Sequence, residues 1–271
     1  MNLLFCINPK FRPLLCQCLQ SIVKHGGEEH YDAYILHSDL TQEDMDAVTS
    51  VSDRVRCRFV TVNPADFDGF PESVRYPRQI YYRLAAPLLL PETLDRILYL
   101  DVDTLVINPL RELYSMDFEG SYYIACTHVR EALTRFNNHR LNVPEGAPYV
   151  NTGVMVLNLE ALRRNLTMEE IRQTALQKVD SFWLPDQDLL TVLHGDKILL
   201  ADTQKYNLSD RILNLYNANP RHPRHDLAWV RENTVVLHFC GKNRPWKPHY
   251  VGSLGVFYEE LVGDGQLTID S

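Results

Sequence analysis

The alternation of short apolar runs with helical patterns in the first 62 residues limits the fold of this chain more than any other feature. Apolar runs at 2–7 and 31–37 have the length and composition of strands, and 56–62, which alternates polar and apolar residues at its start, is expected to be a third strand. Between the first two runs, apolar side chains recur at helical spacing, and Thr41 with Asp44 has the pattern of a capping box that begins a second helix. Strands that alternate with helices predict an α/β fold, in which a mostly parallel central sheet carries helices on both faces.

Similar apolar and helical patterns predict strands and helices in the rest of the chain. Further strands are expected at 96–100, 122–126, 149–159 and 234–240, and further helices at 78–90, 160–180, 186–194 and 254–262. The polar segment 203–232 shows no assignable pattern. Because no repeat, low-complexity tract or linker divides the sequence, we expect one domain over residues 1–271.

Composition and charge narrow the class of protein. Hydrophobic residues make up 45% of the sequence, which is enough to fill a core, and the formal net charge of −8 argues against a nucleic-acid partner, because phosphate binding needs a basic face. No stretch approaches the roughly 20 apolar residues of a membrane-spanning helix, and the N-terminus lacks the basic leader of a signal peptide. The six cysteines are scattered through apolar patterns, as reduced thiols are. We therefore expect a cytoplasmic protein without a transmembrane segment.

Two aspartates interrupt a strongly apolar stretch, RILYLDVDTLVINPL, at 96–110. Asp101 and Asp103 are two residues apart and so share a face, at or just past the carboxyl end of a strand, where open α/β sheets bind ligands. Two close carboxylates repel each other unless a cation offsets their charge, and Mg²⁺ or Mn²⁺ prefers such oxygen ligands. The alternative is a turn with two solvated aspartates, since Asp-x-Asp alone is a weak motif.

A second group of polar residues follows the last expected strand, in VVLHFCGKNRPW at 235–246. His238 offers an imidazole, which suits a borderline cation such as Mn²⁺. Gly241 allows a ligand to approach the backbone closely, while Lys242 and Arg244 bring positive charge for phosphate oxygens. The alternative is a core histidine with surface bases. Together with the two aspartates, however, these residues would hold a metal ion and a diphosphate.

The sequence WLPDQDLL, at 183–190, places acids at the start of an expected helix. Asp186 and Asp188 suit the positive N-terminus of that helix, and capping accounts for at least one of them. The functional interpretation is that Asp186 and Gln187 face a cleft and hydrogen-bond a sugar.

The sequence YVNTGVMVLNL, at 149–159, interrupts an apolar strand with polar residues. Asn151 and Thr152 are followed by Gly153, and glycine inside a strand indicates that another group approaches the backbone closely. A simple β-bulge is the alternative.

Taken in order, these motifs resemble those of the family 8 glycosyltransferases, most of all the bacterial lipopolysaccharide and lipooligosaccharide galactosyl- and glucosyltransferases. The similarity runs from residue 2 to about residue 250 and includes VNPADFDGFP, YYRL, ILYLDVDTLV, NTGVMVLNL, PDQDLL and HFCGKNRPW. It implies a GT-A fold with a Rossmann-like sheet, and transfer of galactose or glucose from a UDP-sugar with retention of configuration. It also implies Mn²⁺ or Mg²⁺ as cofactor and a glycan or glycolipid acceptor.

The resemblance further assigns parts of the chain to tasks. It implies a nucleotide-binding half at about 1–107, a half at about 108–250 that holds the acceptor and completes the metal site, and a terminal helix at about 253–263. The implied metal ligands are Asp101, Asp103 and His238. The implied donor-binding residues are Cys6, Asn8, Arg83, Asp101, Val102, Asn151, Thr152, Asp186, Gln187, Gly241, Lys242 and Arg244, and the implied catalytic residues are Gln187, Asp186 and Arg244.

The chain departs from the family pattern in three places. It has INPK after the first strand where the family often has acidic residues, which affects the base and ribose contacts of Asn8. Arg244 stands where a lysine usually binds the diphosphate, with Lys242 two residues earlier, and either can fill that role. The C-terminal sequence YEELVGDGQLTIDS is acidic where some relatives carry a basic aromatic tail, so it does not support docking to a membrane surface.

The reaction implied by the family also limits the mechanism. Retention normally requires a carboxylate nucleophile, but the resemblance puts the amide of Gln187 at that place. A neutral amide is a poor nucleophile, so we expect front-face substitution, in which the acceptor hydroxyl enters beside the departing diphosphate and Asp186 orients the sugar.

Two other classes of protein remain as alternatives. YLDVDTLV is similar to the nucleophilic strand of haloacid-dehalogenase phosphatases, although Thr104 stands where that family usually has glycine. A non-catalytic protein that binds sugar nucleotides or glycans is the second alternative.

Overall fold

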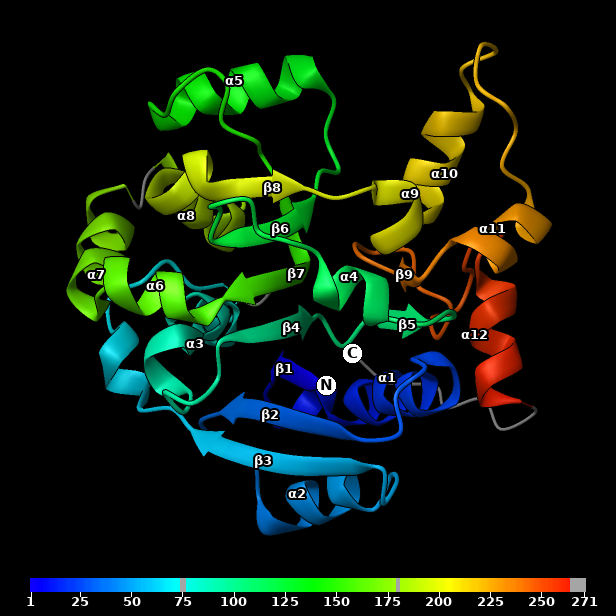
Figure 1. Ribbon diagram of the computed structural model, residues 1–271, viewed down its shortest axis with the longest axis horizontal. Helices are drawn as coiled ribbons and strands as arrows, with labels where there is room; N and C mark the ends of the chain where they lie inside the picture. Colours follow the sequence, from blue (N-terminus) through cyan, green and yellow to red (C-terminus); the bar gives the residue numbers. More distant parts are fainter. Residues whose placement is uncertain (74–76, 179–180, 264–271) are drawn as a thin grey trace.

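A seven-stranded sheet forms the centre of the computed structural model, which describes residues 1–73, 77–178 and 181–263 (Figure 1). The strand order is β3-β2-β1-β4-β7-β6-β8. Its strands are β1 (Asn2–Cys6), β2 (Tyr31–His37), β3 (Val55–Thr61), β4 (Arg96–Leu100), β6 (Tyr123–Cys126), β7 (Asn151–Asn158) and β8 (Ile198–Leu200). Four of the six neighbouring pairs are parallel, which confirms the predicted mostly parallel sheet.

Strand β7 is the exception, because it runs antiparallel to both β4 and β6. Leu100, the last residue of β4, pairs with Val154 near the start of β7. The backbone N–H of Asp101 then donates to the carbonyl of Gly153 over 2.7 Å. The start of β7 therefore lies against the carboxyl end of β4, which brings two of the polar motifs together.

Helices cover both faces of the sheet, as predicted. The α-helices are α1 (Arg12–His25), α2 (Gln42–Thr49), α3 (Tyr82–Leu89), α4 (Arg111–Ser115), α5 (Glu131–Leu141), α6 (Leu159–Asn165), α7 (Met168–Gln177), α8 (Pro185–His194), α9 (Thr203–Tyr206), α10 (Asp210–Asn217), α11 (Leu227–Asn233) and α12 (Gly255–Val262). Short 3₁₀ turns span Pro9–Phe11, Pro64–Phe67, Arg78–Tyr81 and Gly195–Lys197. Thr41 caps α2 through the capping box predicted with Asp44.

The side chains of β4 show how the two cores arise. Ile97 and Tyr99 pack into a core with α3, α6, α7 and α8, while Leu98 and Leu100 pack into a second core with α1, α2 and α4. Alternate residues of a strand point to opposite faces, so a strand buried on both faces must be apolar throughout. The continuous apolar run at 97–100, which Arg96 precedes, is the sequence signature of that position.

A second sheet of two antiparallel strands, β5 (Thr104–Val106) and β9 (Val236–His238), stands beside the central one (Figure 1). Its register pairs Thr104 with His238. The strand expected at 234–240 is thus shorter than expected, and it lies outside the central sheet. The terminal helix α12 occupies the place expected for it and packs with these strands in a third core.

Several expected boundaries were wrong. The helix expected at 160–180 is two helices, because Thr167 begins α7 with a capping box of its own, and residues 179–180 lie outside the described part of the chain. The helix expected at 78–90 begins as a 3₁₀ turn and ends at Leu89. The unassigned segment contains α9, α10 and most of α11, each of which begins at a capping side chain: Asp202, Ser209 or Asp226.

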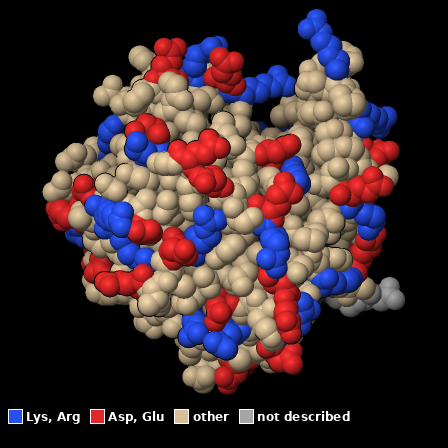
Figure 2. All heavy atoms as spheres, in the orientation of Figure 1, with Lys and Arg blue, Asp and Glu red and all other residues tan. Residues whose placement is uncertain are grey.

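The surface is mixed in charge. Figure 2 shows acidic and basic side chains interspersed over the face in view. Within the described residues, none of the helices combines the length and the apolar composition that a membrane crossing requires. All six cysteines lie in the described part of the chain and are free thiols.

Candidate functional site

Asp101, Asp103 and His238 converge at the carboxyl end of β4. Their ligand atoms all lie within 4.8 Å of one another. The His238 Nε2 is 3.1 Å from Asp103 Oδ1 and 3.8 Å from Asp101 Oδ2. The fold therefore brings together all three predicted metal ligands, although 135 residues separate Asp103 from His238.

Local structure explains how the three residues meet. Strand β4 ends at Leu100, and Asp101 to Asp103 form a turn into β5 rather than a continuation of one strand. The hydroxyl of Thr104 fixes this turn by donating to the Asp101 carbonyl over 2.7 Å. Because Thr104 pairs with His238 across the small sheet, the imidazole arrives beside the turn.

Gly153 leaves room for this metal-ligand group. A Cβ at Gly153 would lie 2.2 Å from His238 Cε1 and 2.8 Å from Asp101 Oδ2, far inside van der Waals contact. The close approach predicted at this glycine is therefore made by side chains of the group itself. A bulge is present as well, since the pairing of β6 with β7 shifts register between Ala125 and Cys126.

Charges in the group are strongly coupled. Burial raises the pKa of Asp101. Burial would also raise the pKa of Asp103, but His238 and Arg244 outweigh that effect and hold its pKa at about 2. Burial disfavours the imidazolium of His238, yet Asp103 raises its pKa overall. Positive charge between the two carboxylates is thus what stabilises this arrangement, and a divalent cation supplies such charge.

Asn207 is a buried residue that sequence reasoning missed. Its Oδ1 lies 2.9 Å from His238 Nδ1, and its Nδ2 donates to Asn151 Oδ1 over 3.0 Å. Because the amide oxygen faces Nδ1, that ring nitrogen carries a proton and Nε2 is left for the carboxylates or a metal. Asn207 lies in the segment that had no assignable pattern, and nothing in its neighbours marks it.

Tyr99 is a second missed residue, and the sequence did contain a signal for it. Its hydroxyl donates to Asp101 Oδ1 over 2.5 Å. Tyr99 is two residues before Asp101, so strand alternation alone puts both side chains on one face.

Arg83 joins the metal-ligand group to the sugar-binding candidates. Its guanidinium is buried, and Nη1 lies 3.1 Å from Asp101 Oδ1 and 3.3 Å from Asp186 Oδ2. The same nitrogen donates to the carbonyl of Thr152 over 3.2 Å. The hydroxyl of Thr152 in turn donates to Asp186 Oδ2 over 2.5 Å. Arg83, Thr152 and Asp186 therefore form one connected network, while their roles around a sugar stay predictions.

The two acids at the start of α8 do different things. Asp188 accepts hydrogen bonds from the backbone N–H groups of Trp183 and Leu184, so the capping alternative applies to this residue. Asp186 instead pairs with Arg83, and its contact with a sugar stays a prediction. Gln187 is half-buried beside it, and its side-chain amide makes no hydrogen bond to the described residues.

The loop after β9 brings a cation to the carboxylates. Gly241 has a φ of 101°, a conformation that favours glycine. Arg244 donates through Nε to the Gly241 carbonyl over 2.8 Å, and its Nη2 lies 3.3 Å from Asp103 Oδ2. Lys242 is exposed and pairs with no acid in the described part of the chain. Of the two candidate bases, Arg244 is the one held at the metal-ligand group.

The remaining predicted residues lie at the end of β1 and in the turn after β4. Cys6 is the last residue of β1, and burial raises the pKa of its thiol to about 12. The Asn8 Oδ1 is buried and has no hydrogen-bond partner among the described residues. An unpaired buried acceptor is costly, so this atom is suited to a ligand that donates a hydrogen bond. Val102 lies in the turn itself and is half-buried.

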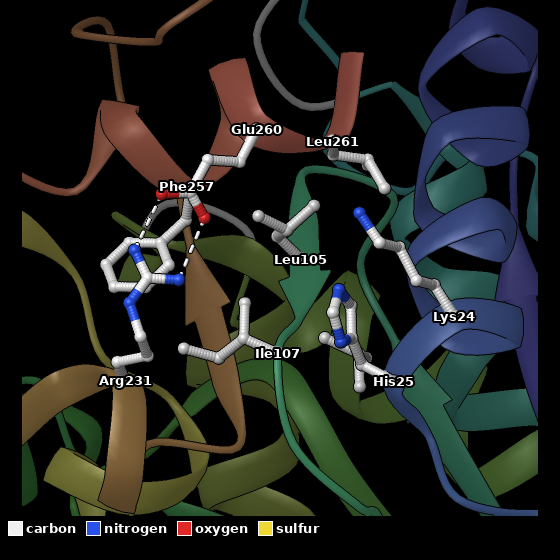
Figure 3. Close-up of a pocket in the computed structure, with 9 residues that line it drawn as sticks. Lys24, His25, Leu105, Ile107, Arg231, Phe257, Glu260 and Leu261 are labelled. Carbon is white, nitrogen blue, oxygen red and sulfur yellow. Dashed lines mark hydrogen bonds and ion pairs between the residues drawn. The ribbon is translucent and has the colours of Figure 1, made fainter. Parts of the chain in front are cut away.

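Two cavities lie outside this network. One, of about 70 Å³, is lined by residues of α1, β5, α11 and α12 with Ile107, and includes none of the predicted site residues (Figure 3). Arg231 and Glu260 form an ion pair at its edge. The other measures about 380 Å³ and is lined by Arg130, Leu215, Ala218, Asn219 and His222.

Comparison with known proteins places this geometry among sugar-transferring enzymes. The family model described as glycosyl transferase family 8 matches residues 2–249. The chain is 25% identical over 234 residues to a lipopolysaccharide 1,2-glucosyltransferase of Escherichia coli, which covers 84% of this chain and 68% of the relative. It is 28% identical over 208 residues to general stress protein A of Bacillus subtilis, which covers 73% of this chain and 69% of the relative.

Solved structures of glycosyltransferases share the fold of this chain. The galactosyltransferase LgtC, solved with donor and acceptor sugar analogues, superposes with a TM-score of 0.81 at 25% identity, over 97% of this chain and 95% of that one. An active-site mutant of LgtC superposes with a TM-score of 0.82 at 26% identity and the same coverage.

Proposed function

Because the chain belongs to glycosyl transferase family 8, we propose that it transfers galactose or glucose from a UDP-sugar to a glycan or lipopolysaccharide-type acceptor, with retention of configuration and with Mn²⁺ or Mg²⁺ as cofactor. The similarity to a lipopolysaccharide glucosyltransferase and to the galactosyltransferase LgtC supports this substrate class. The family also argues against the phosphatase alternative.

The observation that carries the proposal is the convergence of Asp101, Asp103 and His238. Two carboxylate oxygens and one imidazole nitrogen suit Mn²⁺, and three protein ligands leave coordination positions for diphosphate oxygens. Arg83 and Arg244 flank the group on either side. The residues present therefore fit a cation that is shared with a nucleotide diphosphate.

Around that centre, the donor would lie between the end of β1 and the start of α8. Cys6, Asn8 and the backbone of Val102 would contact the base and ribose, and the unpaired Oδ1 of Asn8 would accept a hydrogen bond there. The hexose would lie among the residues of the Arg83 network and its neighbours, which are Arg83, Asn151, Thr152, Asp186 and Gln187. Gly241 and Arg244 would hold the diphosphate, with exposed Lys242 as a weaker contributor.

The mechanism we propose uses no protein nucleophile. A bound divalent cation would supply Lewis-acid stabilisation to the leaving UDP. Arg244 would add positive charge where negative charge develops on the diphosphate. Asp186 is engaged with Arg83 and Thr152, which favours a role in orienting the sugar over nucleophilic attack. The acceptor hydroxyl would attack from the face that UDP leaves and pass its proton to a diphosphate oxygen.

The larger cavity is a suitable entrance for the acceptor. Its volume of about 380 Å³ lies within the range of about 300–1,000 Å³ that is typical of small-molecule sites. Arg130, on its wall, follows His128 by two residues, and the His128 ring lies 6.0 Å from that of His238. One wall of the cavity is therefore joined, through this short stretch of chain, to a residue beside His238.

A donor screen tests the proposal directly. UDP-glucose, UDP-galactose and UDP-N-acetylhexosamines are added with and without Mn²⁺, and the melting temperature and the release of UDP are measured. We expect one UDP-hexose to stabilise the protein only with the metal present, and UDP release to follow. Stabilisation without any consumption of donor would support the non-catalytic alternative, and no response to any donor would refute the proposal.

A further inference from the structure

Helix α5 has an inverted pattern of burial. Its asparagines, Asn137 and Asn138, are buried, whereas Leu133 is 52% exposed and Phe136 is 49% exposed. Leu133 and Phe136 are three residues apart and so lie on one side of the helix. A helix that only packs on a core buries its apolar side, so this exposed apolar side marks an interaction surface.

Trp183 extends this surface from a different part of the chain. Its side chain is 60% exposed, and the centre of its ring lies 5.6 Å from that of Phe136. The guanidinium of Arg140 lies over the Trp183 ring, 4.6 Å from its centre. A cation thus backs the indole, while most of its surface stays open to solvent.

The position of Trp183 is fixed by a buried carboxylate. Asp188 is fully buried; it accepts a hydrogen bond of 2.6 Å from the backbone N–H of Trp183 and pairs with Arg140 over 2.7 Å. Tyr149 also donates to Asp188 over 2.7 Å. The same acid therefore holds both the backbone of Trp183 and the cation beneath its indole, which makes the aromatic pair a built surface rather than a chance exposure.

Both segments that carry the aromatic pair adjoin the edge of the sheet where the metal-ligand group lies, since α5 begins there and Asp186, at the start of α8, pairs with Arg83. Helix α5 follows β6, which is parallel to β8 and antiparallel to β7, so it begins at the edge where β4 ends (Figure 1). Trp183 precedes Asp186 by three residues, and Arg130, on the wall of the larger cavity, immediately precedes α5. A chain of sugars entering that cavity has α5 beside it.

From this arrangement we propose that Trp183 and Phe136 form an aromatic platform that stacks on a hexose ring of the acceptor glycan, at least one sugar away from the ring that receives the transferred hexose. This inference rests on the proposed function. The flat face of an indole matches the C–H face of a pyranose, and the polar side chains around it can bond the ring hydroxyls. Arg135 and His139 are exposed on the same helix and supply such donors.

A sugar fits this surface better than a lipid. The apolar area consists of three side chains, Leu133, Phe136 and Trp183, and Glu131 and Arg135 form an ion pair on the same helix. Docking to a bilayer requires a wider apolar face and an excess of basic residues. The platform also predicts that affinity depends on acceptor length, because only a longer glycan reaches both the transfer site and the indole.

The test measures binding rather than turnover. Linear glucose and galactose oligosaccharides of one to four units are titrated by calorimetry into the protein with UDP and Mn²⁺ present. The variants are Trp183→Ala, Trp183→Phe and, as a control, Leu227→Ala, which truncates an exposed apolar side chain on α11. We expect Trp183→Ala to weaken the binding of a tetrasaccharide about tenfold, the loss of one aromatic stack, and to leave the monosaccharide unchanged. The tetrasaccharide affinity of Trp183→Phe should lie between those of the wild type and Trp183→Ala. The affinity of Leu227→Ala should equal that of the wild type.

Three outcomes would overturn the platform. The first is equal binding of tetrasaccharides by the wild type and Trp183→Ala, including no binding by either. The second is an equal loss for short and long sugars. The third is Trp183-dependent sedimentation with vesicles of phosphatidylethanolamine and phosphatidylglycerol. Failure of the proposed function would look different, because the wild type would then release no UDP from any donor whether or not it binds oligosaccharides.

Discussion

Two regions of different construction meet at the metal-ligand group. One, which we call the sheet side, consists of β4, the start of β7, α3 and the start of α8, and supplies the aspartates and Arg83. The other, the β9 side, consists of residues 203–217 and 236–246 and supplies His238, Asn207 and Arg244. The last four residues of β4 are buried between two cores, whereas β9 has three residues and pairs in its sheet with β5 alone.

The difference shows how each side keeps its residues in place. On the sheet side, apolar burial on both faces positions β4, and hydrogen bonds from Tyr99 and Thr104 then hold Asp101 at its end. On the β9 side, Asn207 crosses to the sheet side by donating to Asn151 while it accepts from His238. The sheet side therefore rests on packing and on local hydrogen bonds, whereas the β9 side depends on a hydrogen-bonded link between distant parts of the chain, and the two should respond differently to mutation.

Removing a sheet-side ligand should have the largest effect. Asp103→Asn keeps the shape of the side chain but removes the charge that pairs with His238 and Arg244. We expect sugar transfer to fall on the order of 10³-fold, because several kcal/mol of charge stabilisation depend on the cation. The Mn²⁺-dependent rise in melting temperature with UDP should disappear. Asp53→Asn, which alters an exposed acid before β3, should leave both unchanged; normal activity in Asp103→Asn would exclude this residue as a ligand.

The second largest effect is expected from replacing Arg244, the basic residue that the β9 side holds at the metal-ligand group. Arg244→Ala should lower kcat/KM roughly 10²-fold, because the guanidinium is aimed at the carboxylates and at the expected diphosphate. Lys242→Ala should lower it much less, since that side chain is exposed. Steady-state kinetics with saturating Mn²⁺ separate the two. The reverse order of effects would transfer the diphosphate role to Lys242.

The two sides also differ in how far they could be predicted from the sequence. Strand β4 was predicted correctly because a strand buried on both faces is a continuous apolar run. The two aspartates after it stood out because they interrupt that run. Gly153 was recognised because a glycine also stands out inside an apolar strand. The fold class followed from the alternation of strands and helices in the first 62 residues.

The β9 side was harder to predict because its structure depends on contacts distant in sequence. Helix α9 has only four residues, too few to show a period, whereas the apolar side chains of the eight-residue α10 do recur at helical spacing but were not recognised within the polar segment around them. The register that sets Thr104 opposite His238 joins residues from opposite halves of the chain. Asn207 has no local signal at all, since its role exists only once Asn151 and His238 are both beside it.

Removing the Asn207 side chain, which links His238 to Asn151, tests whether the β9 side depends on this hydrogen-bonded contact. Asn207→Ala should weaken Mn²⁺ binding roughly 10- to 100-fold, as the loss of a partner that orients a metal-binding histidine does. The transfer rate at saturating Mn²⁺ should recover most of its value, because Asn207 positions His238 and does not touch the donor. Calorimetry of Mn²⁺ with UDP measures the affinity. Asn214→Ala, an exposed asparagine on α10, is the matched control, and an equal affinity in both variants would leave Asn207 without this role.

The smallest expected effect comes from removing one helix cap on the β9 side and one cap that lies on neither side. Thr41 caps α2, far from the site, and Ser209 caps α10, two residues after Asn207. Alanine at either position should cost about 1 kcal/mol of unfolding free energy. Only Ser209→Ala should also weaken Mn²⁺ binding, because it loosens the segment that carries Asn207. Denaturant unfolding and Mn²⁺ titration of both variants decide this, and equal metal affinities would show that the link does not depend on α10.

The Thr41 cap also carries a dependence on pH. Hydrogen bonds from the Thr41 backbone and hydroxyl lower the pKa of Asp44 below its ordinary value of 3.8. A carboxyl group with a lowered pKa in the folded state stabilises the fold above that ordinary value and loses this contribution as pH falls through the lowered one. The difference in the free energy of unfolding between the wild type and Thr41→Ala should therefore be largest at neutral pH and become smaller below pH 3.8. A gap that stays constant down to the acid transition would show that the hydroxyl acts on the helix backbone alone, without stabilising the Asp44 carboxylate.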